Sequence, residues 1–525
     1  MKKIKYAIMG LALIATTTSC NDWLDLKPNN EQVTADYWKS KEDVESVIAS
    51  GYYYMRGNVP NYIKWGELRG GAFYTTNTSD ARLQDFNMTP SISICDYANV
   101  YKIINMANSV IYYAPGVRGK DDTYYEAVMN AHLCEAYFQR AYSYLILLKN
   151  YGSVPLVTEP YVDDTQSFDK AKSTEEEIVA QIKSDVLKAI ELNAAKGVYE
   201  VEWQTKGRAT KWALYALMAD VCLWSEDYQE CAKYCDLILN ATDTFRPVFL
   251  SNTNDWYTIF YPGNSNESIF ELNWDYNTEN MNNNFSSLWS LSPSSILRFT
   301  DDVTEKMKQE TQELEERGTV ADGRMGRMCF ATYVPNGGFS GGYLTASMYY
   351  FWKYAGTDIQ DFTGGVRVHQ DANFIIYRVA EIILMKAQAE VMMGNFKEAV
   401  TQINRIRNRA GLGNYADIDL KADDADSQLA QLDEQTLLEQ ILDQKELEFM
   451  GEAKRWYDLL WFGRISNYKY KSQFINMVIK GNQTTNKSWI QSVLVDPNSW
   501  YMPLPQADMD HNRLLEQNPY YSSSN

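Results

Sequence analysis

Hydrophobic positions recur with helical spacing along most of this chain. Apolar residues between Val44 and Tyr52 follow an i, i+3, i+4, i+8 stripe, and Ser40 and Asp43 in front of it have the spacing of a capping box. A second capping-box pattern, Thr174 with Glu177, precedes another apolar stripe. The same periodicity predicts long helices over 97–114 and 124–149.

Two segments have the pattern of helical hairpins. In 209–239 and again in 381–409, small residues alternate with aromatic ones on the faces of two helices joined by a short turn. Small residues let two helices approach closely, which is the packing of tetratricopeptide-type repeats. We therefore predict an all-helical, right-handed stack of helix pairs.

The segment between the hairpins, 249–354, has a different pattern. It is rich in asparagine and aromatic residues and lacks long helical periodicity except over 296–316. A loop region of this length inside a compact protein is usually functional or disordered. Its aromatic content argues against disorder, so we expect a ligand-binding role.

The first twenty residues have the pattern of a lipoprotein signal. A basic start is followed by an apolar run over 6–15 and by Thr17-Thr18-Ser19-Cys20, which resembles a lipobox despite Thr17 in place of the preferred leucine. We expect 1–19 to be removed and Cys20 to be lipidated; ordinary secretion with a free Cys20 thiol is the alternative. No later stretch reaches the ~20 apolar residues of a membrane helix, so the lipid alone would be the membrane anchor.

Composition narrows the classes of partner. The formal net charge is -19, and loss of Lys2, Lys3 and Lys5 with the signal takes it to about -22. Nucleic acid is therefore not an expected partner. A hydrophobic content of 45% over 525 residues is enough for a large packed core.

Candidate chemistry is sparse. His132, His369 and His511 are the only histidines, and no G-x-S-x-G, H-E-x-x-H or P-loop pattern occurs, so we predict no catalytic residue and no cofactor. Cys231 and Cys235 at i, i+4 are predicted to be buried thiols rather than zinc ligands. Aspartate runs do not match the spacing of a calcium loop, so no metal is expected. A glycosidase built from two carboxylates that meet in space stays open as an alternative.

Eight ordered motifs resemble those of the SusD/RagB family of Bacteroidota outer-membrane lipoproteins. They run from the cysteine to the C-terminus: Cys20–Asp25 with Pro28, 135–142 with 151–156, 208–213, 267–271, 377–382, 403–412, 503–505 and 517–520. The resemblance implies a mainly α, SusD-like fold with tetratricopeptide-type helix pairs and a large, irregular, loop-rich ligand-binding portion. It also implies an N-terminal region, 20–245, and a C-terminal region, 246–525, packed as one unit.

One motif departs from the family pattern. Glu448, Glu452 and Arg455 have the spacing of one helix face, and the residues around them differ from the family's usual pairs. A catalytic role for the two carboxylates is possible, but buried ion pairing that orients the helix is the commoner arrangement.

Glycan-binding members of this family commonly contact their ligand through the loop after the first helix and through the insertion that follows the 267–271 motif. A sugar needs flat aromatic surfaces for its C–H faces and amide, carboxylate or guanidinium groups for its hydroxyls. Both loops supply such residues, and the candidates are Phe73, Tyr74, Asp80, Arg82, Trp274, Tyr276, Asn283, Phe285 and Trp289. We expect Tyr74, Trp274 and Trp289 to form a stacking platform.

The resemblance implies a nutrient-binding lipoprotein of the cell surface and not an enzyme. Its cargo would be an oligosaccharide or polysaccharide, passed to a SusC-like TonB-dependent outer-membrane barrel. Two alternatives stay open at this point: capture of oligopeptides by the same architecture, and a repeat scaffold that binds only protein. The 14% aromatic content favours sugar over peptide.

Overall fold

The computed structural model describes residues 37–162, 166–278, 282–318, 327, 331–333, 348–358, 365–484 and 486–522. The predicted signal peptide and Cys20 lie outside these ranges. The described chain is mainly helical, as predicted.

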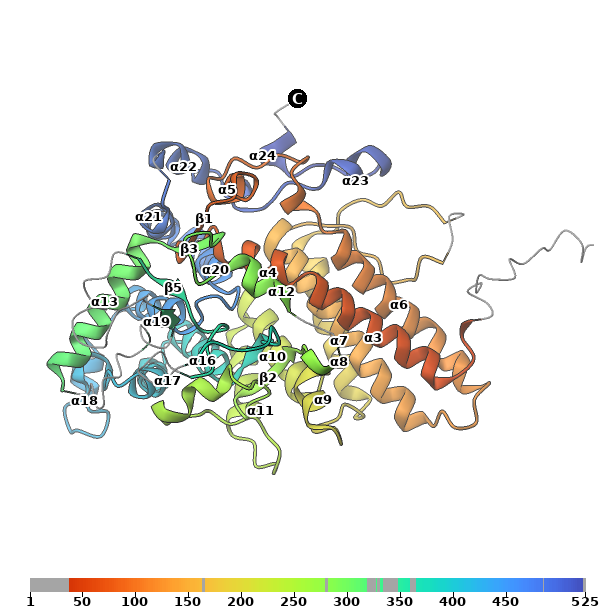
Figure 1. The fold of residues 1–525 in the computed structure, drawn as a ribbon, viewed down its shortest axis with the longest axis horizontal. Helices are drawn as coiled ribbons and strands as arrows, with labels where there is room; N and C mark the ends of the chain where they lie inside the picture. Colours follow the sequence, from red (N-terminus) through yellow and green to blue (C-terminus); the bar gives the residue numbers. More distant parts are fainter. Residues whose placement is uncertain are drawn as a thin grey trace, which may run out of the picture.

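Four long helices of the N-terminal half lie side by side: α3 (Lys41–Gly57), α6 (Ala98–Arg118), α7 (Glu126–Tyr151) and α8 (Glu175–Glu191) (Figure 1). Both predicted capping boxes are present. The Asp43 carboxylate accepts a hydrogen bond from the Ser40 backbone N–H at 2.8 Å, and Glu177 accepts one from that of Thr174 at 2.9 Å. Each box satisfies amide groups that the first helical turn leaves without partners.

Both predicted helical hairpins are confirmed. The first pairs α10 (Lys211–Trp224) with α11 (Tyr228–Leu239), and the second pairs α16 (Val379–Met392) with α17 (Phe396–Arg409). Helix α11 packs directly against α16, so the two hairpins form one stack although they are far apart in the sequence.

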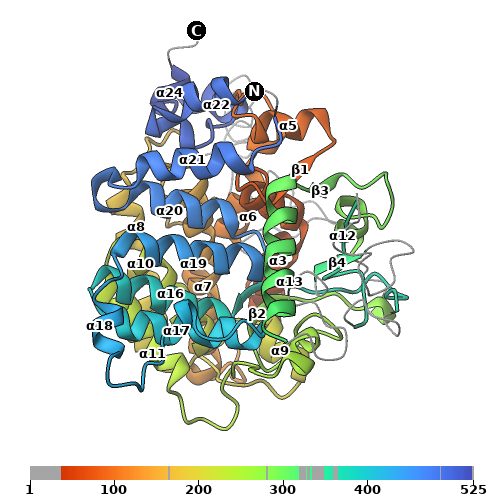
Figure 2. The same cartoon turned by 90° about the vertical axis from the view of Figure 1, so that its left-hand side faces the viewer.

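The C-terminal helices continue this stack. Figure 2 shows α19 (Glu434–Glu448), α20 (Arg455–Tyr468) and α21 (Lys471–Gly481) as successive layers, with α13 (Asp301–Glu316) running across their ends. The shorter elements are α4 (Val59–Glu67), α5 (Thr78–Gln84), α9 (Glu202–Gly207), α12 (Asn283–Leu288), α18 (Ala425–Leu429), α22 (Lys487–Leu494), α23 (Gln506–His511), α24 (Pro519–Ser522) and the 3-10 turns Ser93–Cys95, Thr253–Ile259, Tyr276–Thr278, Tyr415–Asp417 and Pro497–Trp500.

The described chain also contains short strands, which the helical pattern of the sequence did not predict. Three two-stranded antiparallel sheets occur in the described residues: β1 (Phe73–Thr75) with β3 (Leu297–Phe299), β2 (Ser268–Leu272) with β6 (Phe374–Arg378), and β4 (Thr332–Tyr333) with β5 (Tyr350–Phe351). Residues 297–299 pair with β1 and so form a strand, whereas a helix was expected over 296–316. Thr300 then caps α13 by accepting from the Val303 N–H.

The prediction that Glu448, Glu452 and Arg455 share one helix face was wrong. Helix α19 ends at Glu448 and α20 begins at Arg455. Between them Gly451 has φ +77°, and a Cβ there would lie 2.4 Å from a ring carbon of Phe351. Left-handed backbone at this position lies in the turn that separates the two helices, and only glycine fits the space.

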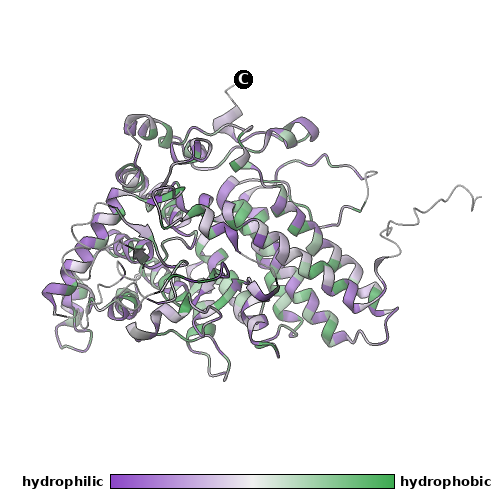
Figure 3. Ribbon diagram, in the orientation of Figure 1, coloured by the Kyte–Doolittle hydropathy of each residue, from purple (hydrophilic) through white to green (hydrophobic). Residues whose placement is uncertain are grey.

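One large core cluster contains buried residues from Met55 to Tyr521, and a smaller one lies under α3, α6 and α7. The long helices carry both hydrophobic and hydrophilic residues along their length (Figure 3). Among the described residues, no helix combines the length and apolar character needed to cross a bilayer.

Candidate functional site

Strand pairing brings the two predicted loop regions together. β1 follows the first helices and β3 belongs to the insertion, and their register sets Phe73 opposite Phe299 and Tyr74 opposite Arg298. Side chains alternate along a strand, so Phe73 and Tyr74 point to opposite faces of this small sheet. Phe73 is buried, whereas Tyr74 is partly exposed.

On one face lies a buried aromatic cluster, defined as Phe73, Phe285, Trp289, Phe351 and Tyr354. The Phe73 and Trp289 rings lie 5.4 Å apart, and Trp289 lies 4.5 Å from Phe351. Phe285 stacks on Tyr354 at 4.0 Å. Phe73, Phe285 and Trp289 are at most 6% exposed, so these three predicted ligand contacts are covered by their own neighbours.

A cleft of about 340 Å³ lies beside the β1–β3 sheet and is lined by Phe73 and Phe299 as well as by Tyr74 and Arg298. We call it the Tyr74 cleft; Tyr74 and Arg298 come from the sheet, and Lys308 comes from α13. The Lys308 ammonium lies 5.7 Å from the centre of the Tyr349 ring. Asp301 and Glu305 add exposed carboxylates to the rim. The cleft therefore offers an aromatic face among charged hydrogen-bonding groups.

A second cleft, of about 210 Å³, lies beside the aromatic cluster and is called the His369 cleft. Its rim carries His369, whose ring stacks on Tyr276 at 3.7 Å and 14°. Trp289 lines the floor, and within the described residues its indole N–H has no acceptor.

The other predicted site residues lie around these clefts in different states. Asp80 is buried and pairs with Lys64 at 2.8 Å. The Arg82 guanidinium donates to the Asn87 carbonyl at 3.1 Å. Both residues thus make structural contacts that hold α5 and the loop after it in place. Asn283 is exposed at the start of α12.

The expected platform of Tyr74, Trp274 and Trp289 is not assembled as one surface. Tyr74 lines its own cleft, Trp289 is in the aromatic cluster, and the Trp274 ring lies over the Arg56 guanidinium at 5.9 Å. The binding role of each residue stays a prediction.

Sequence reasoning missed Lys308, Tyr349, Tyr350 and His369 as cleft residues. A signal for Lys308 was present, because 301, 304, 305 and 308 have the i, i+3, i+4, i+7 spacing of one helix face. The tyrosines follow no such pattern. Their placement depends on where the insertion folds back.

The carboxylates of the atypical motif lie in a buried ion cluster and line neither of the two clefts. Arg409 bridges Glu267 and Glu448, both at 2.6 Å, and Arg378 binds Glu452 at 2.8 Å. Burial alone would raise the pKa of Glu448, but Arg409 and Arg378 hold it at about 2. The interpretation as ion pairing is confirmed, and a carboxylate held ionised by two arginines is poorly suited to proton transfer.

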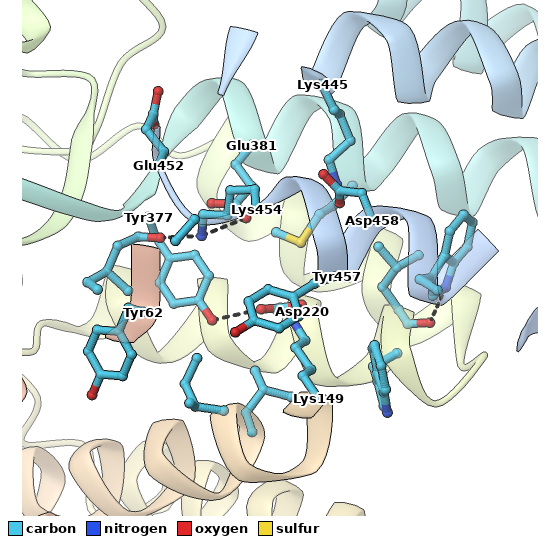
Figure 4. A pocket seen from close by; sticks show the side chains of 18 of the residues that line it. Tyr62, Lys149, Asp220, Tyr377, Glu381, Lys445, Glu452, Lys454, Tyr457 and Asp458 are labelled. Carbon is cyan, nitrogen blue, oxygen red and sulfur yellow. Dashed lines mark hydrogen bonds and ion pairs between the residues drawn. The ribbon is translucent and has the colours of Figure 1, made fainter. Parts of the chain in front are cut away.

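A polar chamber of about 50 Å³ lies between the N-terminal and C-terminal helices (Figure 4). Asp220 of α10 accepts hydrogen bonds from Lys149 at 2.6 Å and from the Tyr377 hydroxyl at 2.9 Å. The chamber's other ion pairs are Lys454 with Glu381, at 2.9 Å, and Lys445 with Asp458. It has room for a few water molecules but not for a sugar, so we interpret it as a polar joint between the two halves.

The two cysteines predicted to be buried are buried. Cys231 and Cys235 are free thiols in the core, and the His132 ring bonds the Tyr124 hydroxyl at 3.0 Å. Burial lowers the pKa of His132, which favours the neutral ring.

Comparison with known families covers nearly the whole described chain. The SusD family description matches residues 258–521, and a second description, starch-binding associating with outer membrane, matches residues 22–223. The chain belongs to the SusD family. Members of the SusD family are binding proteins rather than enzymes, and association with the outer membrane is part of the second description.

Relatives of this SusD-family chain are distant in sequence but match most of its length. SusD-like protein P38 of Formosa agariphila is 24% identical over 87% of this chain and 91% of its own, and a SusD-like protein of Bacteroides ovatus is 23% identical over 97% of each.

Solved structures show the same fold. A SusD superfamily protein of Bacteroides thetaiotaomicron has a TM-score of 0.70 at 20% identity, covering 92% of this chain and 99% of that one. A laminarin-binding SusD-like protein has a TM-score of 0.65 at 19% identity, covering 92% and 100%. The SusD-like fold expected from the sequence is confirmed.

Proposed function

We propose that this SusD-family protein binds an oligosaccharide or polysaccharide at the cell surface and delivers it to a SusC-like TonB-dependent outer-membrane barrel. The observation that carries the proposal is the Tyr74 cleft, where a tyrosine face lies among a guanidinium, an ammonium and carboxylates. The His369 cleft, with the exposed Tyr276–His369 stack, extends the same binding face.

The chemistry of the cleft fits a sugar. Tyr74 offers a partly exposed ring that removes an apolar sugar face from water. Arg298, Lys308 and Glu305 supply donors and acceptors for the hydroxyls around that face. The narrow concave shape suits a ligand that is thin and polar at its edges.

The predicted ligand residues divide by their exposure. Tyr74, Trp274, Tyr276 and Asn283 present accessible groups and are proposed as direct contacts. Phe73, Phe285 and Trp289 are proposed to shape the wall between the two clefts, and Asp80 and Arg82 to hold α5 beside it.

The comparisons support a glycan over a peptide. One structural neighbour is named for binding laminarin, and the description that matches residues 22–223 speaks of starch binding. The proposed anchor is a lipid on Cys20, in keeping with outer-membrane association. The net charge of -19 disfavours nucleic acid as a competing partner.

Affinity electrophoresis against a panel of soluble polysaccharides, laminarin and starch included, tests the binding step. We expect retention of the wild-type chain by at least one polysaccharide and a loss of affinity of about tenfold or more in Tyr74→Ala, since one aromatic face is lost. Tyr112→Ala is the control, because this exposed tyrosine of α6 lines neither cleft. Retention of peptides and of no glycan would show the cargo assignment to be wrong.

Co-purification from outer membranes in mild detergent tests the delivery step. We expect a barrel partner near one to one with the wild-type chain, because paired helices offer a rigid docking surface while the cleft loops meet cargo. Recovery of the chain alone, under conditions that preserve other barrel complexes, would contradict the partner.

A further inference from the structure

A third hollow, of about 250 Å³, opens between α3 and α9. We call it the Trp203 hollow; Tyr53 and Arg56 of α3 form one wall, Trp203 of α9 forms the other, and Asn273 closes the end. Figures 1 and 2 place α9 on the same side of the molecule as α12 and the insertion loops.

Two strongly exposed aromatic side chains flank this hollow. Trp203 is 49% exposed and Tyr53 is 64% exposed. A Cβ at Gly207 would lie 3.2 Å from the Trp203 indole and 2.3 Å from the Asn273 amide nitrogen. The absence of a side chain at Gly207 therefore lets the indole rest against the backbone with much of its surface open to solvent.

Polar groups stand beside these rings. The Arg56 guanidinium lies between Tyr53 and Trp274, about 6 Å from each ring centre, and donates to the Asn273 carbonyl at 3.1 Å. Like the Tyr74 cleft, the hollow combines aromatic rings with a guanidinium, and here a side-chain amide is added.

Hydrogen bonds link one end of the hollow to the proposed binding face. Asn373 donates to the Asn273 side chain at 2.7 Å and accepts from the Trp274 N–H at 3.1 Å, which ties the end of the hollow to the segment leading into the His369 cleft. Tyr276, two residues beyond Trp274, stacks on His369 at the rim of that cleft.

We propose that the Trp203 hollow is an additional subsite for the same glycan, so that the protein holds an extended polysaccharide chain rather than a short oligosaccharide. This inference rests on the proposed function. The hollow is concave and has open ring faces with hydrogen-bonding groups between them. A sugar chain fits such a shape better than a flat surface of another protein would. Two linked subsites raise the affinity of a long ligand without improving that of a fragment that reaches only one.

The experiment compares chain lengths. Laminarin and its trisaccharide, and any other polysaccharide that the wild-type chain retains together with its own trisaccharide, are titrated by calorimetry. We expect Trp203→Ala to lower affinity for the polymer about tenfold or more while leaving the trisaccharide unchanged. Tyr74→Ala should weaken both. Trp203→Tyr should restore most of the polymer affinity, since it replaces the aromatic face.

Two controls keep the outcome clear. Tyr112→Ala removes a ring of similar exposure from α6 and should change neither affinity. Thermal unfolding should match the wild type for Trp203→Ala; if it does not, Tyr53→Ala removes the opposite ring of the hollow and is compared instead.

The results separate this inference from the proposed function. Polymer and trisaccharide affinities unchanged in both Trp203→Ala and Tyr53→Ala would overturn the subsite but leave glycan binding intact. If these variants lose the barrel partner while their glycan affinity stays unchanged, the hollow is a protein contact. This result would also overturn the subsite. A wild-type chain that binds no glycan of any length would overturn both.

Discussion

Arg409 and Glu448 lie 2.6 Å apart with both side chains completely buried. Arg409 ends α17 and Glu448 ends α19, and the arginine also reaches Glu267, directly before β2. The ion cluster thus ties the segment that leads into the insertion to the C-terminal helix stack. A buried charge is tolerated only when oppositely charged side chains pair with it.

Breaking this pair should destabilise the protein strongly. We expect Arg409→Ala to cost about 3–5 kcal/mol of unfolding free energy, because it leaves Glu448 and Glu267 buried with fewer counter-charges. Urea denaturation measures the loss. Lys397→Ala, which removes a partner from the exposed Lys397–Asp426 pair, is the control and should leave stability nearly unchanged. A small effect at Arg409 would mean that the cluster admits water.

Glu67 should make stability depend on pH. Burial raises its pKa to about 8, partly offset by a hydrogen bond from the Ala453 N–H at 2.8 Å. The folded state keeps this proton between about pH 4.5 and 8 while the unfolded state loses it, so stability falls as pH rises through that window.

Glu67→Gln carries no titrating group in either state. We expect its stability to fall less than that of the wild type between pH 5 and pH 8, by on the order of 3 kcal/mol. Urea midpoints at several pH values measure the difference. Glu42→Gln, on the surface of α3, is the charge-matched control. Parallel curves for Glu67→Gln and the wild type would contradict a protonated Glu67.

Substitutions of Trp289 and Tyr276 should distinguish residues that form the wall between the clefts from residues that contact the ligand. Trp289 is 4% exposed within the aromatic cluster, so Trp289→Ala should cost about 3–5 kcal/mol and lower the melting temperature. Tyr276 is 43% exposed, so Tyr276→Ala should fold normally and lose glycan affinity. If Trp289→Ala instead melts like the wild type and loses glycan binding, Trp289 itself contacts the ligand.

Cys20 should carry the membrane anchor. We expect Cys20→Ala to move the protein from the membrane to the soluble fraction and to abolish incorporation of labelled palmitate, because the thiol is the attachment point in a lipobox. Cys95→Ala, which removes a buried core thiol, is the control for loss of a cysteine. Equal labelling with and without Cys20 would refute the anchor.

The local sequence predicted the helices well, because the interactions that define them join residues close together in the chain. The Ser40–Asp43 and Thr174–Glu177 boxes and the two hairpins depend on residues a few positions apart, which keep the same partners in almost any surrounding. The turn at Gly451 escaped prediction, because it is required by the Phe351 ring from a distant segment.

The arrangement of the proposed binding face was predicted only in part. Its two loops were named correctly as neighbours, through the resemblance to the family and their aromatic content. Which ring is open was not predictable: Phe73 and Tyr74 are adjacent in sequence, yet strand pairing buries the first and leaves the second partly exposed.

By itself the sequence determined the helix pairs, the family and the regions from which the proposed site is built, because short-range spacing and ordered motifs carry that information. Tertiary structure alone decided which side chains line a cleft. The pairing of β1 with β3, the return of Tyr349 and Tyr350 beside α13, and the approach of α9 to α3 all join residues far apart in the chain. Burial of a ring is a property of everything packed around it, and no local pattern specifies those neighbours.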